Sequence, residues 1–87
     1  MTIRIVLADD HELFRSGFRA ALETQADFEC VADVGDGRAA IEAVERLAPD
    51  VAVLDVRMPI MDGLEAAETI LRGGSSTKII QIGRAHV

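Results

Sequence analysis

Hydrophobic and polar positions follow two alternating periods along the chain, and this alternation predicts strands separated by helices. Residues 3–8 and 51–56 are short, nearly continuous apolar runs, typical of central strands covered on both faces. Residues 28–34 alternate more, which favours an outer strand, and residues 78–82 start a fourth strand. Between them, apolar residues recur every three or four positions, as on one face of an α-helix. These helical stripes lie within residues 13–22, 40–47 and 64–71. The pattern predicts an α/β fold, a doubly wound parallel sheet with helices on its faces.

Composition and charge exclude several classes of protein. The 87 residues carry a formal net charge of −6, which repels the phosphate backbone, so we expect no direct binding of nucleic acid by this segment. No apolar run approaches the roughly 20 residues of a membrane span. Residues 1–5 lack the layout of a signal peptide, so we expect a cytoplasmic protein. The single cysteine, Cys30, excludes an internal disulfide and is expected to be a small core or interface residue.

Three carboxylates lie where predicted strands end. Asp9 and Asp10 follow the first strand, and Asp55 lies near the end of the third. The carboxyl ends of parallel strands meet at one edge, so these groups converge if the first and third strands are neighbours. Clustered carboxylates need a counter-charge, and oxygen ligands with open water positions favour Mg²⁺. A metal held there would let an aspartate accept a phosphoryl group.

Simpler roles are open for the same residues. Asp9 or Asp10 can cap the following helix, because aspartate is a preferred N-cap residue. Asp55 can face water at a strand end, although an ionised carboxylate in an apolar strand is costly. The remaining residues near these loops are interpreted as structural: Asp62 as a turn or cap residue, His11 as a solvated loop residue, and Met58 and Met61 as packing residues.

Two stretches carry a family resemblance. The segments LADDHELFRSGFRAAL (7–22) and DGRAAIEAVERLAPDVAVLDVRMPIMDGLEAA (36–67) resemble the receiver domain of two-component response regulators, of the NarL/FixJ type. The resemblance covers about residues 3–80, and its combination of acid pair, strand-ending acid and D-x-R-M-P-x-M-D-G string is specific. It implies a flavodoxin-like sheet with strand order 2-1-3-4, without the family's fifth strand and last two helices.

The resemblance also implies a role for each matching residue. Asp55 matches the phospho-acceptor, Asp10 a direct Mg²⁺ ligand and Asp9 its acidic partner. The backbone carbonyl of Arg57 matches a third protein ligand of the metal. Pro59 and Gly63 match residues that shape the loop after the acceptor.

The implied partner is a sensor histidine kinase that docks on the helix around residues 13–22, with small phosphodonors as a second source of phosphoryl groups. Full-length relatives of this type usually add a C-terminal helix-turn-helix domain, so the implied output is regulation of transcription. The implied chemistry is self-phosphorylation and self-dephosphorylation rather than enzymatic turnover.

The end of the sequence departs from the family pattern. The family places a Thr or Ser at the end of strand four and a Lys at the end of strand five; here Gly83 or Arg84 falls at the hydroxyl position, and the Lys is absent. Residues 82–87 can be back-translated as ATC GGA AGA GCA CAC GTC, which matches a common sequencing adapter; the alternative is a natural tail that happens to match it. We therefore predict a partial receiver domain over residues 1–81 and a non-native tail over residues 82–87.

Two further functions stay open. A receiver fold can act as a phosphorylation-independent protein-binding module, and a fragment can lack function altogether. A haloacid-dehalogenase-type phosphatase also uses an aspartate nucleophile, but it has a second acid two residues later, where this chain has Arg57.

Overall fold

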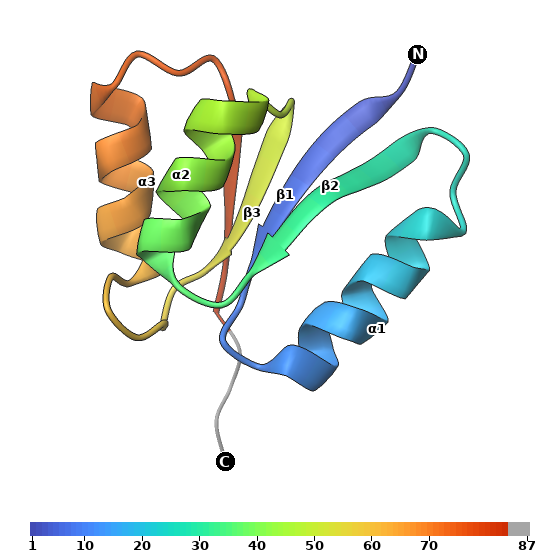
Figure 1. The fold of residues 1–87 in the computed structure, drawn as a ribbon, viewed down its shortest axis with the longest axis horizontal. Helices are drawn as coiled ribbons and strands as arrows, with labels where there is room; N and C mark the ends of the chain where they lie inside the picture. Colours follow the sequence, from blue (N-terminus) through green and yellow to red (C-terminus); the bar gives the residue numbers. More distant parts are fainter. Residues whose placement is uncertain (84–87) are drawn as a thin grey trace.

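Four parallel strands form a single sheet in the order β2-β1-β3-β4 (Figure 1). The computed structural model describes residues 1–83. The strands are β1 (Ile3–Ala8), β2 (Phe28–Val34), β3 (Val51–Asp55) and β4 (Lys78–Ile82), and the helices are α1 (Glu12–Glu23), α2 (Gly37–Leu47) and α3 (Gly63–Arg72). The predicted fold class and strand order are confirmed.

The ends of several elements differ slightly from the prediction. The third strand ends at Asp55, one residue early, and α2 begins at Gly37, three residues before its apolar stripe. The predicted boundary after residue 81 stays a prediction, because Ile82 continues β4 and residues 84–87, including Arg84, lie outside the described residues.

Two aspartates set the starts of the second and third helices. The Asp36 carboxylate accepts a hydrogen bond from the Ala39 backbone N–H at 2.8 Å, and Asp62 accepts one from Glu65 N–H at 2.9 Å. Each bond satisfies an N–H group that has no partner within its own helix. The interpretation of Asp62 as a cap residue is confirmed.

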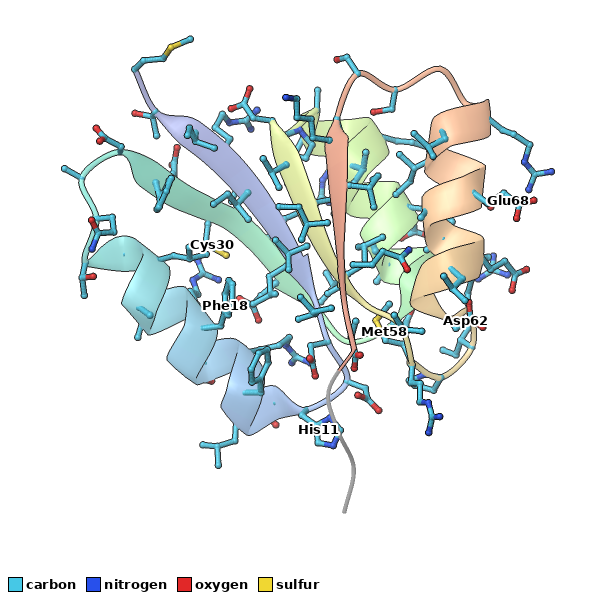
Figure 2. The ribbon with its side chains drawn as sticks, turned by 180° about the vertical axis from the view of Figure 1, so that it is seen from behind. His11, Phe18, Cys30, Met58, Asp62 and Glu68 are labelled. Carbon is cyan, nitrogen blue, oxygen red and sulfur yellow. The ribbon has the colours of Figure 1, made fainter. Side chains whose placement is uncertain are left out.

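The helices divide between the two faces of the sheet, with α2 and α3 on one face and α1 on the other (Figure 1). The buried core under α2 and α3 consists of small and aliphatic residues: Ala8, Ala40, Val44, Ala52, Leu54, Ala66, Ala67 and Ile70. The core under α1 is smaller: Ile5, Leu7, Cys30 and Val53, with Phe18 and Leu22 packed on it (Figure 2). Both cores include residues of the central strands β1 and β3. The acidic residues singled out in the sequence lie at the carboxyl ends of these two strands.

Cys30 lies in the core under α1, as expected from the sequence, and is 5% exposed. Burial raises the pKa of its thiol above the ordinary value, because the thiolate would lose its solvation. A protonated, buried thiol packs as a small apolar group and is a poor nucleophile.

The α1 face is left partly open beside β4. Ile80 pairs in register with Val53 on this face and is 51% exposed, whereas Val53 is 7% exposed. β4 is an outer strand of the described sheet. No helix within residues 1–83 is long and apolar enough to cross a membrane.

Candidate metal centre

The three predicted carboxylates converge at the carboxyl ends of β1 and β3. These strands are neighbours in the sheet, with Ala8 opposite Leu54, so the residues that follow them lie at the same edge. One potential ligand atom from each of Asp9, Asp10, His11 and Asp55 lies within 4.8 Å of the others. The structure therefore brings together the acids that the sequence singled out and adds a histidine to them.

Burial raises the electrostatic cost of holding several carboxylates in this cluster. Asp9 is 0% exposed and Asp55 is 1% exposed, whereas Asp10 lies at the surface. Backbone N–H groups supply part of the compensation: His11 N–H donates to Asp9 Oδ1 at 2.8 Å, and Arg57 N–H donates to Asp55 Oδ1 at 3.3 Å. Adjacent buried carboxylates repel each other unless a positive charge joins them. The cluster is open to solvent on the side of Asp10, where a cation can enter.

His11 contacts both members of the acid pair. Its Nδ1 is 2.9 Å from Asp10 Oδ1 and 3.4 Å from Asp9 Oδ1, and its side chain is 47% exposed. Figure 2 shows it at the lower edge of the sheet, below the end of β1. The interpretation of His11 as a solvated loop residue missed these contacts.

The alternative in which Asp9 or Asp10 caps the first helix is wrong. The N-cap position of α1 belongs to His11, and its side chain makes no capping hydrogen bond. The Asp9 carboxylate instead accepts from the N–H two residues ahead, which leaves it turned towards Asp55.

Gly63 gives the loop after Asp55 its path. A Cβ atom at this position would lie 2.1 Å from the backbone oxygen of Asp55 and 2.8 Å from its carbonyl carbon. The Gly63 N–H also donates to Val56 O at 3.0 Å. Only glycine allows α3 to start this close to the end of β3, which agrees with the prediction that Gly63 shapes this loop.

The rest of this loop packs back on the molecule. Pro59 O accepts from Met61 N–H at 2.7 Å, and Ile60 between them has a left-handed φ of 69°. Met58 and Met61 pack on the core under α2 and α3, so their interpretation as packing residues is confirmed. Met61 O in turn accepts from Gly37 N–H at 2.9 Å, and this bond joins the loop to the start of α2.

Arg15 supports the acid-bearing loop and was missed by the sequence analysis. Its Nη1 donates to the Asp9 backbone oxygen at 2.7 Å, and its Nε donates to Asp33 Oδ1 at 3.2 Å. Asp33 is the next-to-last residue of β2 and also pairs with Arg19. Arg15, which lies on α1, therefore connects Asp9, the residue after β1, with Asp33 near the end of β2.

Replacing Arg15 by alanine is expected to lower the free energy of unfolding by about 2 kcal/mol, because the Asp9 carbonyl and Asp33 both lose a charged donor. Chemical denaturation followed by circular dichroism measures this difference. Arg38→Ala is the matched control, because Arg38 is exposed on α2 and its loss should change stability by less than about 0.5 kcal/mol. Equal effects for the two variants would contradict the supporting role.

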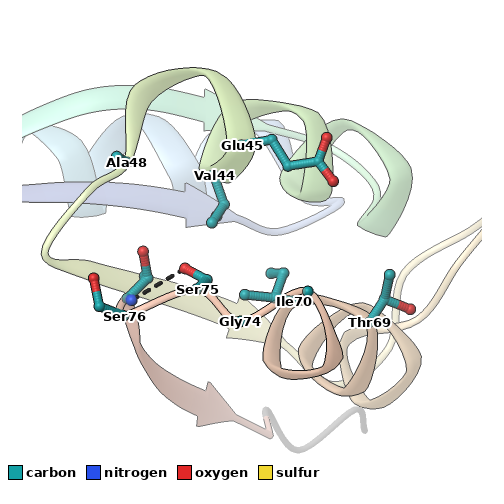
Figure 3. A pocket seen from close by; sticks show the side chains of 10 residues that line it. Val44, Glu45, Ala48, Thr69, Ile70, Gly74, Ser75 and Ser76 are labelled. Atoms are coloured by element: carbon teal, nitrogen blue, oxygen red, sulfur yellow. Dashed lines mark hydrogen bonds between the residues drawn. The ribbon is translucent and has the colours of Figure 1, made fainter.

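A separate hollow of about 380 Å³ lies between the ends of α2 and α3 (Figure 3). Its lining includes Ala48, which precedes β3, and the loop of Ser75 and Ser76, which precedes β4. It therefore lies at the amino ends of the strands, opposite the carboxylates. The Ser75 hydroxyl accepts from Thr77 N–H at 3.1 Å and orders this loop.

Comparison with known protein families gives a match over nearly the whole chain. The family model of the response regulator receiver domain matches residues 5–87. LiaR from Bacillus subtilis, a transcriptional regulatory protein, is 44% identical over 78 residues, which cover 90% of this chain and 37% of LiaR. The transcriptional regulatory protein DegU from Brevibacillus brevis is 41% identical over 78 residues, which cover 90% of this chain and 33% of DegU. The chain thus spans about a third of the length of these curated relatives.

Solved structures show the same fold. The signal receiver domain of NarL from Mycobacterium tuberculosis superposes with a TM-score of 0.93 at 37% identity, covering 99% of this chain and 69% of that one. The response regulator domain of CheB from Thermotoga maritima gives a TM-score of 0.90 at 30% identity, covering 95% and 61%.

Proposed function

Since the chain belongs to the receiver domain family of two-component response regulators, of the NarL/LuxR type, we propose that it accepts a phosphoryl group on Asp55 in a site that holds Mg²⁺. The observation that supports this proposal is the convergence of Asp9, Asp10 and Asp55 from two strands. In this role the domain is a phosphoryl acceptor in the cytoplasm, and its reaction is self-phosphorylation rather than turnover of a substrate.

The donor set fits Mg²⁺. This ion prefers oxygen ligands and retains several waters, and the cluster offers carboxylate oxygens with one solvent-exposed side. Asp9, Asp10 and Asp55 would hold the ion, and we propose the Arg57 backbone carbonyl as a further ligand. When bound, the ion neutralises charge on the acceptor and on the incoming phosphoryl oxygens.

The chain itself positions the acceptor. Arg57 N–H donates to Asp55 Oδ1 and fixes the carboxylate at the strand end. In the proposed step an Asp55 carboxylate oxygen forms a bond to phosphorus. The bond from phosphorus to the donor nitrogen or oxygen breaks, and its electron pair leaves with the donor. No proton has to leave the acceptor, because the attacking group is already a carboxylate.

Receiver domains of response regulators interact with sensor histidine kinases as phosphodonors, and we propose α1 as the docking element for such a kinase here. This helix has no fully buried residue, and Leu13 is 87% exposed beside the acidic edge. An exposed apolar residue this close to the acceptor suits a partner that must bring its phosphohistidine to Asp55. Small phosphodonors would reach the same edge directly, and a DNA-binding output domain would read the modified state.

The lack of a hydroxyl side chain after β4 limits how phosphorylation of Asp55 could change the conformation of the domain. Ile82 O accepts from Val56 N–H at 3.0 Å, so the residue after β4 lies beside the acceptor edge. The hydroxyl that bonds the phosphoryl group in the family falls at Gly83 or Arg84 in this sequence, and neither residue offers one. A Cβ at Gly83 would meet no atom within 4 Å, so the space for a hydroxyl side chain exists. We propose that phosphoryl acceptance persists without the hydroxyl-dependent switch.

Intact-mass measurement tests the proposed acceptor. Wild-type protein incubated with acetyl phosphate and Mg²⁺ is expected to gain the mass of one phosphoryl group, and Asp55→Asn is expected to gain none. Asp62→Asn is the matched control, because Asp62 lies in the same loop but caps α3. An adduct on Asp55→Asn would overturn the assignment, no adduct on either protein would favour a phosphorylation-independent binding module, and steady phosphate release would favour a phosphatase.

A further inference from the structure

The acidic site contains a nitrogen ligand that Mg²⁺ does not need. We propose that His11 Nδ1, with the carboxylates of Asp9 and Asp10, binds a borderline transition-metal ion such as Zn²⁺, and that this ion competes with Mg²⁺. The inference deepens the proposed metal site and rests on it. It does not require that Asp55 accept a phosphoryl group.

The distances between the ligand atoms match those of a shared metal ion. Zn²⁺ lies about 2.0–2.1 Å from nitrogen and oxygen ligands, so two such ligands are about 2.9 Å apart at a right angle and about 3.4 Å apart at a tetrahedral angle. His11 Nδ1 is 2.9 Å from Asp10 Oδ1 and 3.4 Å from Asp9 Oδ1. A single ion can therefore contact all three side chains after small movements.

The His11 backbone is held in place at both ends. Its N–H donates to Asp9 Oδ1 at 2.8 Å, and its carbonyl oxygen accepts from Arg15 N–H at 3.0 Å at the start of α1. The side chain is about half exposed, so an ion can reach the ring from solvent. A ligand whose backbone is already fixed loses little entropy when the metal binds.

The chemistry of the donors separates the two metals. Imidazole is a good ligand for Zn²⁺, Cu²⁺ and Ni²⁺, whereas Mg²⁺ prefers oxygen ligands and water. A Zn²⁺ ion held by His11 would use the same Asp9 and Asp10 carboxylates as Mg²⁺, so only one of the two ions can occupy the site. Zn²⁺ would consequently inhibit Mg²⁺-dependent phosphoryl transfer to Asp55.

Calorimetric titration of the metal-free protein tests this site. The buffer should be mildly alkaline, because imidazole ligates metal only in its neutral form. We expect His11→Gln to weaken Zn²⁺ binding at least roughly tenfold and to leave Mg²⁺ affinity within about twofold. His86→Gln is the matched control for the other histidine of the chain and should bind Zn²⁺ like the wild type. Unchanged Zn²⁺ affinity in His11→Gln would overturn the proposal.

A spectroscopic readout keeps the test independent of the folding of the variant. In His86→Gln protein, nitrogen resonances of the remaining imidazole should show Zn²⁺ at Nδ1, and a shift confined to Nε2 would contradict the geometry. The phosphoryl adduct of His11→Gln, measured with Mg²⁺, separates the two proposals. An adduct with lost Zn²⁺ binding supports both, whereas retained Zn²⁺ binding overturns only the histidine ligand. A missing adduct on the wild type counts against the proposed function alone, and if His11→Gln loses both the adduct and Zn²⁺ binding, the Nδ1 resonance of the His86→Gln protein decides the Zn²⁺ site.

Discussion

The Gly63→Ala variant is expected to lose about 3 kcal/mol of stability, a large share of what a domain of this size has. The added Cβ would lie 2.1 Å from the Asp55 backbone oxygen and 3.1 Å from Val56 Cα. These neighbours are backbone atoms of β3 and of the residue after it, so they cannot rotate away as a side chain can. The clash must be relieved by moving α3 or the end of β3, and either movement displaces Asp55.

Chemical denaturation and the phosphoryl adduct measured on the same variant check both consequences. Gly17→Ala is the matched control, because a Cβ at Gly17 meets no atom within 4 Å and the residue lies inside α1. Alanine is favoured over glycine inside a helix by about 1 kcal/mol, so this control is expected to be more stable than the wild type. A Gly63→Ala protein as stable as Gly17→Ala would show that the loop path does not depend on glycine.

Asp55→Asn is expected to stabilise the metal-free protein while it removes the response to Mg²⁺. Asp55 is buried beside the buried Asp9, and their ligand atoms lie within 4.8 Å of each other. Removing one charge relieves a repulsion on the order of 1–3 kcal/mol, and asparagine can still accept the Arg57 N–H bond. The melting temperature without metal should rise by about 4–8 °C for each kcal/mol.

Melting curves with and without Mg²⁺ measure both parts of this prediction. The wild type should be stabilised by Mg²⁺, because the proposed site exists only in the folded state, and Asp55→Asn should respond much less. Asp62→Asn should keep the wild-type Mg²⁺ response, since Asp62 caps α3 outside the cluster. A metal-free Asp55→Asn protein less stable than the wild type would mean that the carboxylate is held by favourable contacts rather than strained by repulsion.

The architecture and the carboxylate cluster could be predicted because both follow from rules that act along the chain. The spacing of apolar residues distinguishes a strand from a helix, and the carboxyl ends of parallel strands lie at the same edge of the sheet. Asp9 and Asp55 could therefore be brought together before any coordinates were known. Strand order came from the family resemblance, and it is confirmed by the structure.

Residues that act through tertiary contacts could not be predicted in this way. Arg15 occupies a polar position on an amphipathic helix, and only the packing of α1 beside β2 places it between Asp9 and Asp33. The contacts of His11 depend on the residue at which α1 starts, which sequence patterns locate poorly. The one available signal was the position of His11 next to an acid pair, since carboxylates and imidazole often share a metal.

Identification of the residue that carries the phosphoryl group tests the central proposal most directly. Borohydride reduces an aspartyl phosphate to homoserine, which peptide mass spectrometry can locate after treatment with acetyl phosphate and Mg²⁺. We predict homoserine at position 55 alone, and none when a chelator replaces Mg²⁺. Homoserine at position 9 or 10, or at position 55 in the presence of chelator, would contradict a metal-dependent acceptor at the end of β3.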